Sequence, residues 1–384
     1  MRHYQHNEVS MTIVQDVNLL EEIKTYANTQ GTNYPIVNSY NEWDPLEEVI
    51  VGVVEGATIP DLEVAVKATI PEDQIEYFQK NAGKKFPQEA INAAAKELEE
   101  FVNILEGEGI TVRRPDKINQ ARSYGTQEWQ SKGGLYQAMP RDLLIVIGDQ
   151  IIESPLAWRS RYFEIFSFRE MLKDYFKKGG KWVAAPKPEL PDHFYRPEYV
   201  STGNDDEYAI NEFEPTFDAA DFIRCGRDIF VQKSNVTNDF GIDWLARQIG
   251  DKFRVHKLKF TDSHPMHVDA TFMPLAPGHL LLNPERATEI PSLFKSWNIM
   301  YSPKSTLPKS HPMYMSSSWV NMNILMLDEK RVVVERQEQP LIDLFKKNGF
   351  EPILCDFRNF YSFGGGFHCA TVDVRRRGGL QSYV

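Results

Sequence analysis

Cysteine is scarce in this sequence. Its 384 residues include only three, Cys225, Cys355 and Cys369, and no two of them form a CxxC motif. An odd number of cysteines without such a motif argues against a disulfide framework and against a cysteine-based zinc site. The sequence therefore predicts a protein of a reducing compartment with no bound metal.

Long apolar runs and an excess of positive charge are also missing. No apolar stretch approaches the roughly 18 residues that cross a membrane. The formal net charge of −11 argues against nucleic acid or an anionic membrane as a partner, because both require concentrated positive charge. Residues 1–36 carry several acidic residues and no apolar signal core, so we expect an N-terminal arm on a cytoplasmic protein.

Nucleotide-binding glycine motifs are absent as well. The run GGGFHC lies near the end of the sequence and precedes no expected helix, so it is not a dinucleotide fingerprint, and no P-loop occurs. The sequence contains instead a series of short apolar runs with the length and residue types of buried strands. These runs are LEEVIVG (46–52), RDLLIVIG (141–148), GRDIFVQ (226–232), GHLLLN (278–283) and KRVVVE (330–335).

Most of these runs are followed by a helical segment and a second strand. In QPLIDLFKKNGFEPILC the pattern predicts a helix from about Pro340, a stop at Gly349 and then a strand. Residues 93–114, 243–258 and 290–303 repeat this order. Five such β–α–β modules favour an α/β domain that is built from repeats and closed on itself. A doubly wound open sheet would produce the same pattern and stays open as the alternative.

The three cysteines have different surroundings. Cys225 follows apolar residues and Cys355 ends a strand-like run, so both are expected in the core. Cys369 lies between three glycines and three arginines. The glycines would allow the backbone to approach a substrate closely, and the arginines would neutralise acidic neighbours.

Further reactive side chains occur in a few segments. His267 and Asp269 are two residues apart in an expected strand, where both would point to one face. Asp142 stands at the entry to an apolar strand, Asp218 lies among aromatic residues, and Arg286 follows a strand. Each of them alone could be structural. Together with a thiol, however, an imidazole and several carboxylates form a matched chemical set.

This set suits attack on a cationic carbon. A thiol becomes a nucleophile when a nearby imidazolium or a bound cation lowers its pKa. Carboxylates in a closed cavity need positive charge to offset their desolvation, and a planar guanidinium supplies it in a bidentate geometry. The residues therefore indicate an arginine-like substrate without selecting a reaction.

Longer motifs follow one another in order along nearly the whole sequence. They are VNSYNEWDPLEEVIVG, GITVRRPD, GLYQAMPRD, IIESPLAWRSRYFE, FEPTFDAADFIRCGRDIF, MHVDATF, LLNPER, MSSSWVNMNILMLDEKRV and GGGFHCATVDVRRRG. In these motifs the sequence resembles the glycine amidinotransferase family, within the pentein superfamily of enzymes that modify guanidino groups. The resemblance implies one α/β domain over residues 37–384, a five-bladed propeller of ββαβ modules around a central pore that holds the active site.

Matched position by position, the resemblance implies three catalytic residues and six substrate-binding residues. Cys369 would be the nucleophile, His267 the general acid–base and Asp218 the carboxylate that orients the imidazole. Members that use glycine read NPMH where this chain reads HPMH, so the chain departs from the family pattern near the acceptor. The implied binding residues are Asp142 and Asp269 for the guanidinium or amino group, Arg286 and Ser317 for the amino-acid head, and His264 and Met266 near the acceptor.

The resemblance implies an L-arginine amidinotransferase. Arginine would give its amidino group to Cys369, ornithine would leave, and an amine would take up the group. No metal or organic cofactor is expected, since the guanidinium carbon is already electrophilic. Glycine, which gives guanidinoacetate, is the expected acceptor, and lysine or a secondary-metabolite amine is the alternative because of His264. An arginine-type hydrolase and a non-catalytic binding protein remain as other classes, and a homodimer is the expected assembly.

Overall fold

Five three-stranded sheets of one topology form the framework of the protein. The computed structural model describes residues 35–203 and 206–384. In each sheet the central strand is antiparallel to one neighbour and parallel to the other. The sheets are β17 (Thr371–Arg376), β1 (Leu46–Val51) and β2 (Thr111–Arg113); β5 (Leu144–Ile147), β6 (Gln150–Glu153) and β7 (Lys181–Ala184); β8 (Phe222–Cys225), β9 (Asp228–Gln232) and β10 (Arg254–Leu258); β11 (Phe272–Ala276), β12 (His279–Leu282) and β13 (Asn298–Tyr301); β14 (Leu325–Met326), β15 (Arg331–Glu335) and β16 (Glu351–Cys355).

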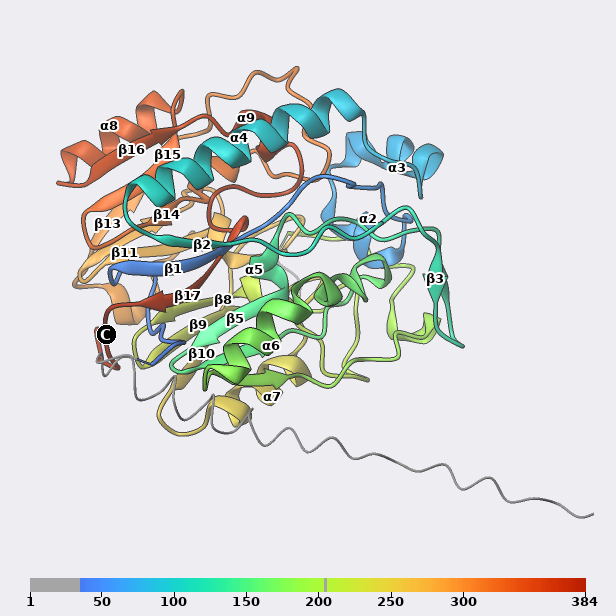
Figure 1. Ribbon diagram of the computed structural model, residues 1–384, viewed down its shortest axis with the longest axis horizontal. Coiled ribbons are helices and arrows are strands. Elements are labelled where there is room, and N and C mark those ends of the chain that lie inside the picture. Colours follow the sequence, from blue (N-terminus) through green and yellow to red (C-terminus); the bar gives the residue numbers. More distant parts are fainter. Residues whose placement is uncertain (1–34, 204–205) are drawn as a thin grey trace, which may run out of the picture.

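A helical segment connects the central strand of each sheet to its parallel neighbour, as expected for parallel strands. Figure 1 shows these helices around the outside, with the strands between them. In the longest, α4 (Gln88–Gly107), the buried side chains recur every three or four residues, so one face packs inward. The other connecting segments are α6 (Arg169–Lys177), α7 (Asp239–Ile249), η7 (Ser292–Phe294) and α8 (Gln339–Lys347).

The remaining elements are short. They are α2 (Val64–Thr69), η1 (Glu72–Gln74), α3 (Ile75–Asn81), the pair β3 (Tyr124–Gly125) and β4 (Gln130–Ser131), α5 (Pro140–Leu143), η2 (Arg159–Arg161), η3 (Glu164–Phe168), η4 (Asp192–Phe194), η5 (Ala219–Asp221), η6 (Val268–Ala270), η8 (Val320–Met322) and α9 (Arg358–Tyr361).

The two ends of the described chain meet in the first sheet. Strand β17 pairs antiparallel with β1 from Leu46 opposite Arg376 to Val51 opposite Thr371. The arginine run there forms ion pairs, as expected: Arg375 and Arg377 contact Glu47, and Arg376 contacts Asp373. This pairing fixes the segment that precedes β17, which contains Cys369.

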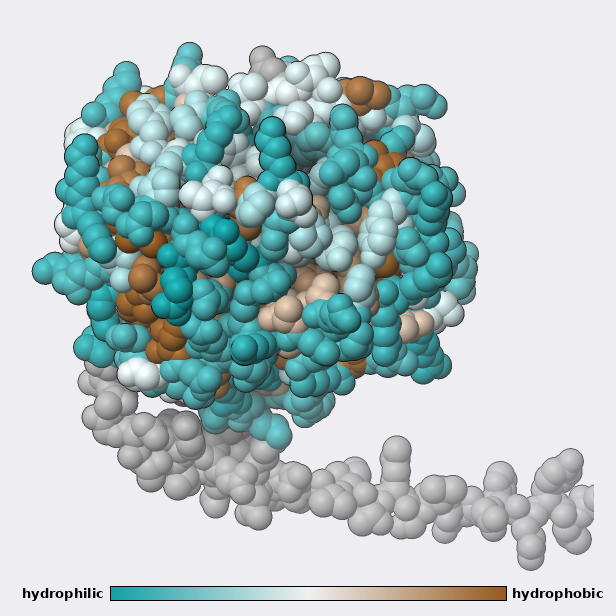
Figure 2. Space-filling model, turned by 90° about the horizontal axis from the view of Figure 1, so that it is seen from above, coloured by the Kyte–Doolittle hydropathy of each residue, from teal (hydrophilic) through white to brown (hydrophobic). Residues whose placement is uncertain are grey.

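The largest apolar cluster supports the same segment. It joins α4 and α9 to the first and fifth sheets. Within it the ring of Phe367 lies 4.1 Å from that of Phe357 and 5.1 Å from that of Phe101, measured between centroids. Two residues before Cys369, the chain is therefore held in close-packed core. The face of the molecule in Figure 2 is mainly hydrophilic.

The structure decides between the two sheet arrangements left open by the sequence. A doubly wound open sheet would place the strands in one sheet, but they form five separate ones, so that alternative is wrong. The closed arrangement of repeated α/β modules agrees with the structure. The expected N-terminal arm lies almost wholly outside the described residues.

Three local expectations are wrong. The run expected as a strand from Arg141 begins with the helical turn α5, because Pro140 at its first turn favours helix. Asp269 lies in the helical turn η6 and His267 directly precedes it, so neither residue is in a strand. The helix expected within 290–303 is the single turn η7. Within the described ranges, no helix is both long and apolar enough to cross a membrane.

Candidate active site

A short turn precedes each sheet. The helical turns α5, η5, η6 and η8 precede four of the sheets, and a turn in which the Ala370 N–H donates to the Gly366 carbonyl at 3.0 Å precedes β17. The turn α5 contacts η5, η5 contacts η6, and η6 contacts η8. Cys369 links the last of these turns to the first. Its backbone N–H donates to Oδ1 of Asn323, which follows η8 (2.8 Å), and its carbonyl accepts from the N–H of Arg141 in α5 (3.3 Å). One residue in or beside each turn faces a common site: Asp142, Asp218, His267, Asn323 and Cys369.

His267 stands at the centre of the polar contacts. Its Nε2 lies 3.0 Å from Asp218 Oδ2, and its Nδ1 lies 3.5 Å from Asp142 Oδ1. The backbone of His267 has a φ of 58°, a left-handed conformation that costs of order 1–3 kcal/mol for a non-glycine residue and is typical of functional sites. Burial opposes a charged imidazole, but the two carboxylates outweigh it and raise the pKa of His267 well above its ordinary value. His267 is therefore a proton donor at neutral pH.

The thiol of Cys369 lies beside this imidazole. Its Sγ is 3.1 Å from Asn323 Nδ2 and 3.4 Å from Asp269 Oδ2. A Cβ added at Gly365 would lie 2.5 Å from Cys369 Cβ. The glycine therefore makes room for the cysteine itself, a different use from the substrate approach expected from the sequence.

Cys369 stays protonated while the site is empty. Burial and the Asp269 carboxylate raise the pKa of the thiol to about 12, although His267 acts in the opposite direction. A cation bound beside the carboxylates would offset their effect, so the thiol would release its proton to solvent and become the thiolate while His267 keeps its own proton. The site therefore needs its substrate to activate its nucleophile.

The raised pKa predicts how Cys369 reacts with iodoacetamide. A thiol with a pKa of about 12 gains thiolate throughout the range from pH 7 to pH 10, so the alkylation rate should rise about tenfold per pH unit without a plateau. In Asp269→Asn the pKa of the Cys369 thiol should be lower, because one of the charges that raise it is gone. The alkylation rate should therefore level off at a lower pH than in the unmodified protein. Peptide mass analysis gives the rate at Cys369 itself. A rate that levels off near pH 9 in the unmodified protein would contradict the prediction.

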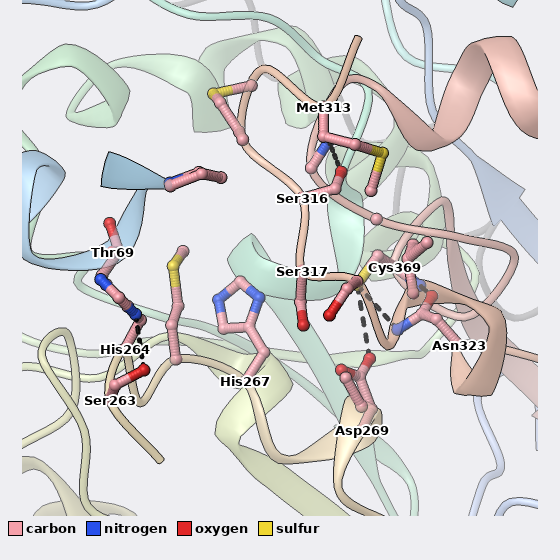
Figure 3. A pocket seen from close by; sticks show the side chains of 18 of the residues that line it. Thr69, Ser263, His264, His267, Asp269, Met313, Ser316, Ser317, Asn323 and Cys369 are labelled. Atoms are coloured by element: carbon pink, nitrogen blue, oxygen red, sulfur yellow. Dashed lines mark hydrogen bonds between the residues drawn. The ribbon is translucent and has the colours of Figure 1, made fainter. Parts of the chain in front are cut away.

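A cavity of about 650 Å³ opens beside the thiol. Figure 3 shows His267, Ser317, Asp269 and Cys369 pointing into one space, with His264 on the far side of His267. Among the residues proposed from the sequence, seven line this cavity: Cys369, His267, Asp269, Arg286, Ser317, Met266 and His264. Asp142 lines a smaller adjoining pocket that shares His267 and Met266, and Asp218 reaches the site through His267.

Arg286 and Ser317 lie together on the cavity wall. An NH2 group of Arg286 donates to Ser317 Oγ at 3.0 Å, and its other terminal nitrogen lies 3.0 Å from Asp262 Oδ2. Burial lowers the pKa of Arg286 although Asp262 opposes this. A cation and a hydroxyl side by side suit the carboxylate of an amino acid.

Sequence reasoning missed three residues beside the site. Asn323 donates to the thiol and accepts from two N–H groups of its loop, those of Gly366 and Cys369. Arg161 donates to Asp142 Oδ2 at 2.6 Å, and His368 Nδ1 lies 2.7 Å from Asp269 Oδ2. The motifs SRY and FHC contain the last two, but no spacing in the sequence links them to the aspartates.

The site also contains a possible ligand set for a metal. Asp142, His267 and Cys369 place three ligand-type atoms within 4.8 Å of one another, and such atoms can hold zinc. The same three atoms suit proton transfer and nucleophilic attack. The metal-free reaction expected from the sequence stays a prediction.

Comparisons with known proteins agree with this geometry. No protein-family model matches the chain. An L-arginine:L-lysine amidinotransferase of Pseudomonas savastanoi pv. phaseolicola is 57% identical over 371 residues, which cover 95% of this chain and 100% of that protein. A mitochondrial glycine amidinotransferase of Gallus gallus is 48% identical over 357 residues, covering 90% of this chain and 84% of that protein.

A solved structure gives the same result. An amidinotransferase of Microseira wollei from the saxitoxin biosynthetic pathway superposes with a TM-score of 0.87 at 49% identity, over 91% of this chain and 100% of that one. Identity and coverage of this size confirm the resemblance found in the sequence and the α/β pentein fold that it implies. The chain belongs to the amidinotransferase family.

Proposed function

We propose that the protein transfers the amidino group of L-arginine to the ε-amine of L-lysine through an amidino-cysteine at Cys369. One observation carries this proposal: a thiol, an imidazole paired with a carboxylate, and a further carboxylate face a cavity that has an arginine and a serine on its wall, and a third carboxylate, Asp142, lines the pocket that adjoins it. The 57% identity to an arginine:lysine enzyme favours lysine over the glycine expected from the sequence.

Arginine fits this cavity in one direction. Its carboxylate binds Arg286 and Ser317, and its guanidinium lies between Asp142 and Asp269. Among the described residues, the Oδ1 atoms of these two aspartates are buried without a hydrogen-bond partner. Asp142 Oδ1 has only the ionic contact with His267 Nδ1 at 3.5 Å. A buried oxygen without a hydrogen bond is costly, and guanidinium N–H groups would donate to both.

The first half-reaction breaks the bond between the amidino carbon and the δ-nitrogen of arginine. The Cys369 thiolate forms a C–S bond to the guanidinium carbon, and the protonated His267 donates its proton to the departing nitrogen. Ornithine leaves as an amine, the amidino-cysteine keeps the positive charge, and His267 becomes neutral.

The second half-reaction reverses these steps with a new amine. The acceptor amine forms a C–N bond to the amidino carbon, and neutral His267 takes the proton that this nitrogen loses. The C–S bond breaks and returns the thiolate. Asp218, 3.0 Å from His267 Nε2, keeps the ring oriented in both directions.

The position of Arg286 on the cavity wall supports lysine as the acceptor. Lysine differs from ornithine by one methylene group, so its carboxylate can use the anchor that ornithine has just left. Glycine has its amine next to its carboxylate, so it cannot contact Arg286 and the amidino carbon at the same time. A glycine enzyme would need a second carboxylate site close to the thiol.

A comparison of acceptors tests the proposal. With arginine as donor, kcat/KM for lysine should exceed that for glycine and for cadaverine, which lacks the carboxylate, by about tenfold to a hundredfold. In Arg286→Met the advantage of lysine over cadaverine should vanish. The products, homoarginine and guanidinoacetate, are separated by mass. Faster formation of guanidinoacetate than of homoarginine would overturn the choice of lysine.

Other expectations accompany this proposal. The three cysteines are unpaired and buried, which suits a reducing compartment, so we place the enzyme in the cytoplasm. A homodimer stays a prediction from the family resemblance.

A further inference from the structure

The two aspartates proposed to bind the guanidinium share an unusual pattern of contacts. In each, one carboxylate oxygen is bonded to a buried basic side chain. Asp142 Oδ2 accepts from Arg161 at 2.6 Å, and Asp269 Oδ2 lies 2.7 Å from Nδ1 of His368. In each, the other oxygen, Oδ1, is buried and has no hydrogen-bond partner in the part of the chain that the structure describes. Asp142 Oδ1 does face the imidazole of His267, at 3.5 Å from its Nδ1.

Arg161 is fixed in place by its own contacts. Its Nε donates to Glu164 Oε2 at 2.7 Å, one NH2 group faces the Met139 carbonyl at 3.3 Å, and its guanidinium carbon lies 5.5 Å from the centre of the Tyr136 ring. The side chain is 2% exposed. Arg161 therefore cannot swing toward a substrate, and the carboxylate of Asp142 has one orientation imposed on it.

His368 holds the second aspartate in a comparable way. Its Nε2 lies 3.2 Å from Glu42 Oε2, and Glu42 is itself paired with Arg224. Both ring nitrogens thus face carboxylate oxygens, which only accept hydrogen bonds. His368 lowers the pKa of Asp269 although burial would raise it, so this aspartate stays ionised.

These contacts have a consequence for substrate recognition. Two carboxylates beside an empty cavity repel each other and would turn toward any donor nearby. A basic residue behind each one offsets the charge and fixes the rotamer, so both Oδ1 atoms face the site before arginine arrives.

We propose that Arg161 and His368 are positioning residues that preset Asp142 and Asp269 as a docking site for the guanidinium group. The proposal rests on the function proposed above, because it assumes that these aspartates bind the guanidinium. Neither Arg161 nor His368 contacts the amino-acid head in this arrangement.

Two probes separate the two ends of the substrate. Agmatine carries the guanidinium without a carboxylate, and L-norvaline carries the amino-acid head without a guanidinium. Their dissociation constants are measured by calorimetry in the Cys369→Ala background, where no amidino group can be transferred. In this background Arg161→Met and His368→Leu, which remove the donors, should weaken the binding of agmatine by about tenfold to a hundredfold and leave the binding of norvaline within about twofold.

Arg286→Met is the matched control and should show the opposite selectivity. It should bind norvaline more weakly and bind agmatine with a nearly unchanged dissociation constant. Arg161→Lys and His368→Asn keep a buried donor and should recover part of the agmatine affinity. They also carry the test if the other two variants do not fold, as judged by thermal unfolding. If Arg161 and His368 were merely structural, their variants would bind agmatine and norvaline more weakly to the same extent.

The outcomes distinguish this inference from the proposed function. If the Cys369→Ala protein binds both probes and the Arg161 and His368 variants bind agmatine as tightly as it does, the positioning role is wrong and the function stands. Equal weakening of both probes would also overturn it. If the Cys369→Ala protein binds neither agmatine nor arginine, the proposed function itself fails.

Discussion

Replacing Cys369 with alanine should abolish amidino transfer, with kcat reduced by at least about a thousandfold. The reaction proposed here proceeds through a bond to this sulfur, and no other thiol can substitute for it. Cys225 and Cys355 are buried in apolar clusters, and unlike Cys369 neither is among the residues that line the cavity. Homoarginine formation from arginine and lysine measures the loss.

The two core cysteines supply matched controls. Cys225→Ala and Cys355→Ala make the same change of side chain as Cys369→Ala but at core positions. Both variants should retain most of the activity, with at most a lower melting temperature. Cys369→Ser should be as inactive as the alanine variant, because a hydroxyl is far less nucleophilic than a thiol at neutral pH. Substantial activity in either Cys369 variant would rule out the covalent route.

The repeated sheets were readable from the sequence because each depends on local patterns. Short apolar runs predicted β1, β9, β12 and β15 almost to the residue, and amphipathic spacing with a terminal glycine predicted α8. The pairing of β17 with β1 could not be read in this way. Those strands lie at opposite ends of the domain, and their contact is decided by the closure of the whole fold.

The site shows the same limit. Alternation of residue types suggested a strand for His267, but tertiary contacts hold it in a left-handed conformation at the start of η6. His267 and Asp269 do share a cavity, as expected, but from a helical turn and not from the expected strand. Asn323, Arg161 and His368 had no local signal, because each acts on a partner from a distant segment.

Arginine alone should separate transfer from hydrolysis. Without an acceptor, we expect a burst of about one equivalent of ornithine per active site and then a stall, as in other reactions through a covalent intermediate. The peptide that contains Cys369 should gain the mass of one amidino group. Lysine should then discharge this adduct and yield one equivalent of homoarginine. Rapid quenching followed by mass analysis of products and peptides measures each step.

The stall depends on keeping water from the amidino-cysteine. The thiol is 3% exposed, and the methionines Met266, Met313 and Met315 on the cavity wall offer water few hydrogen-bonding groups. A hydrolase would use the same thiol, imidazole and carboxylate but admit water to the adduct. Steady formation of ornithine and urea from arginine alone would therefore show that water takes the amidino group from Cys369. Steady formation of citrulline and ammonia would show that ammonia, and not ornithine, leaves in the first step. In either case the cavity beside Cys369 would have to be assigned to hydrolysis.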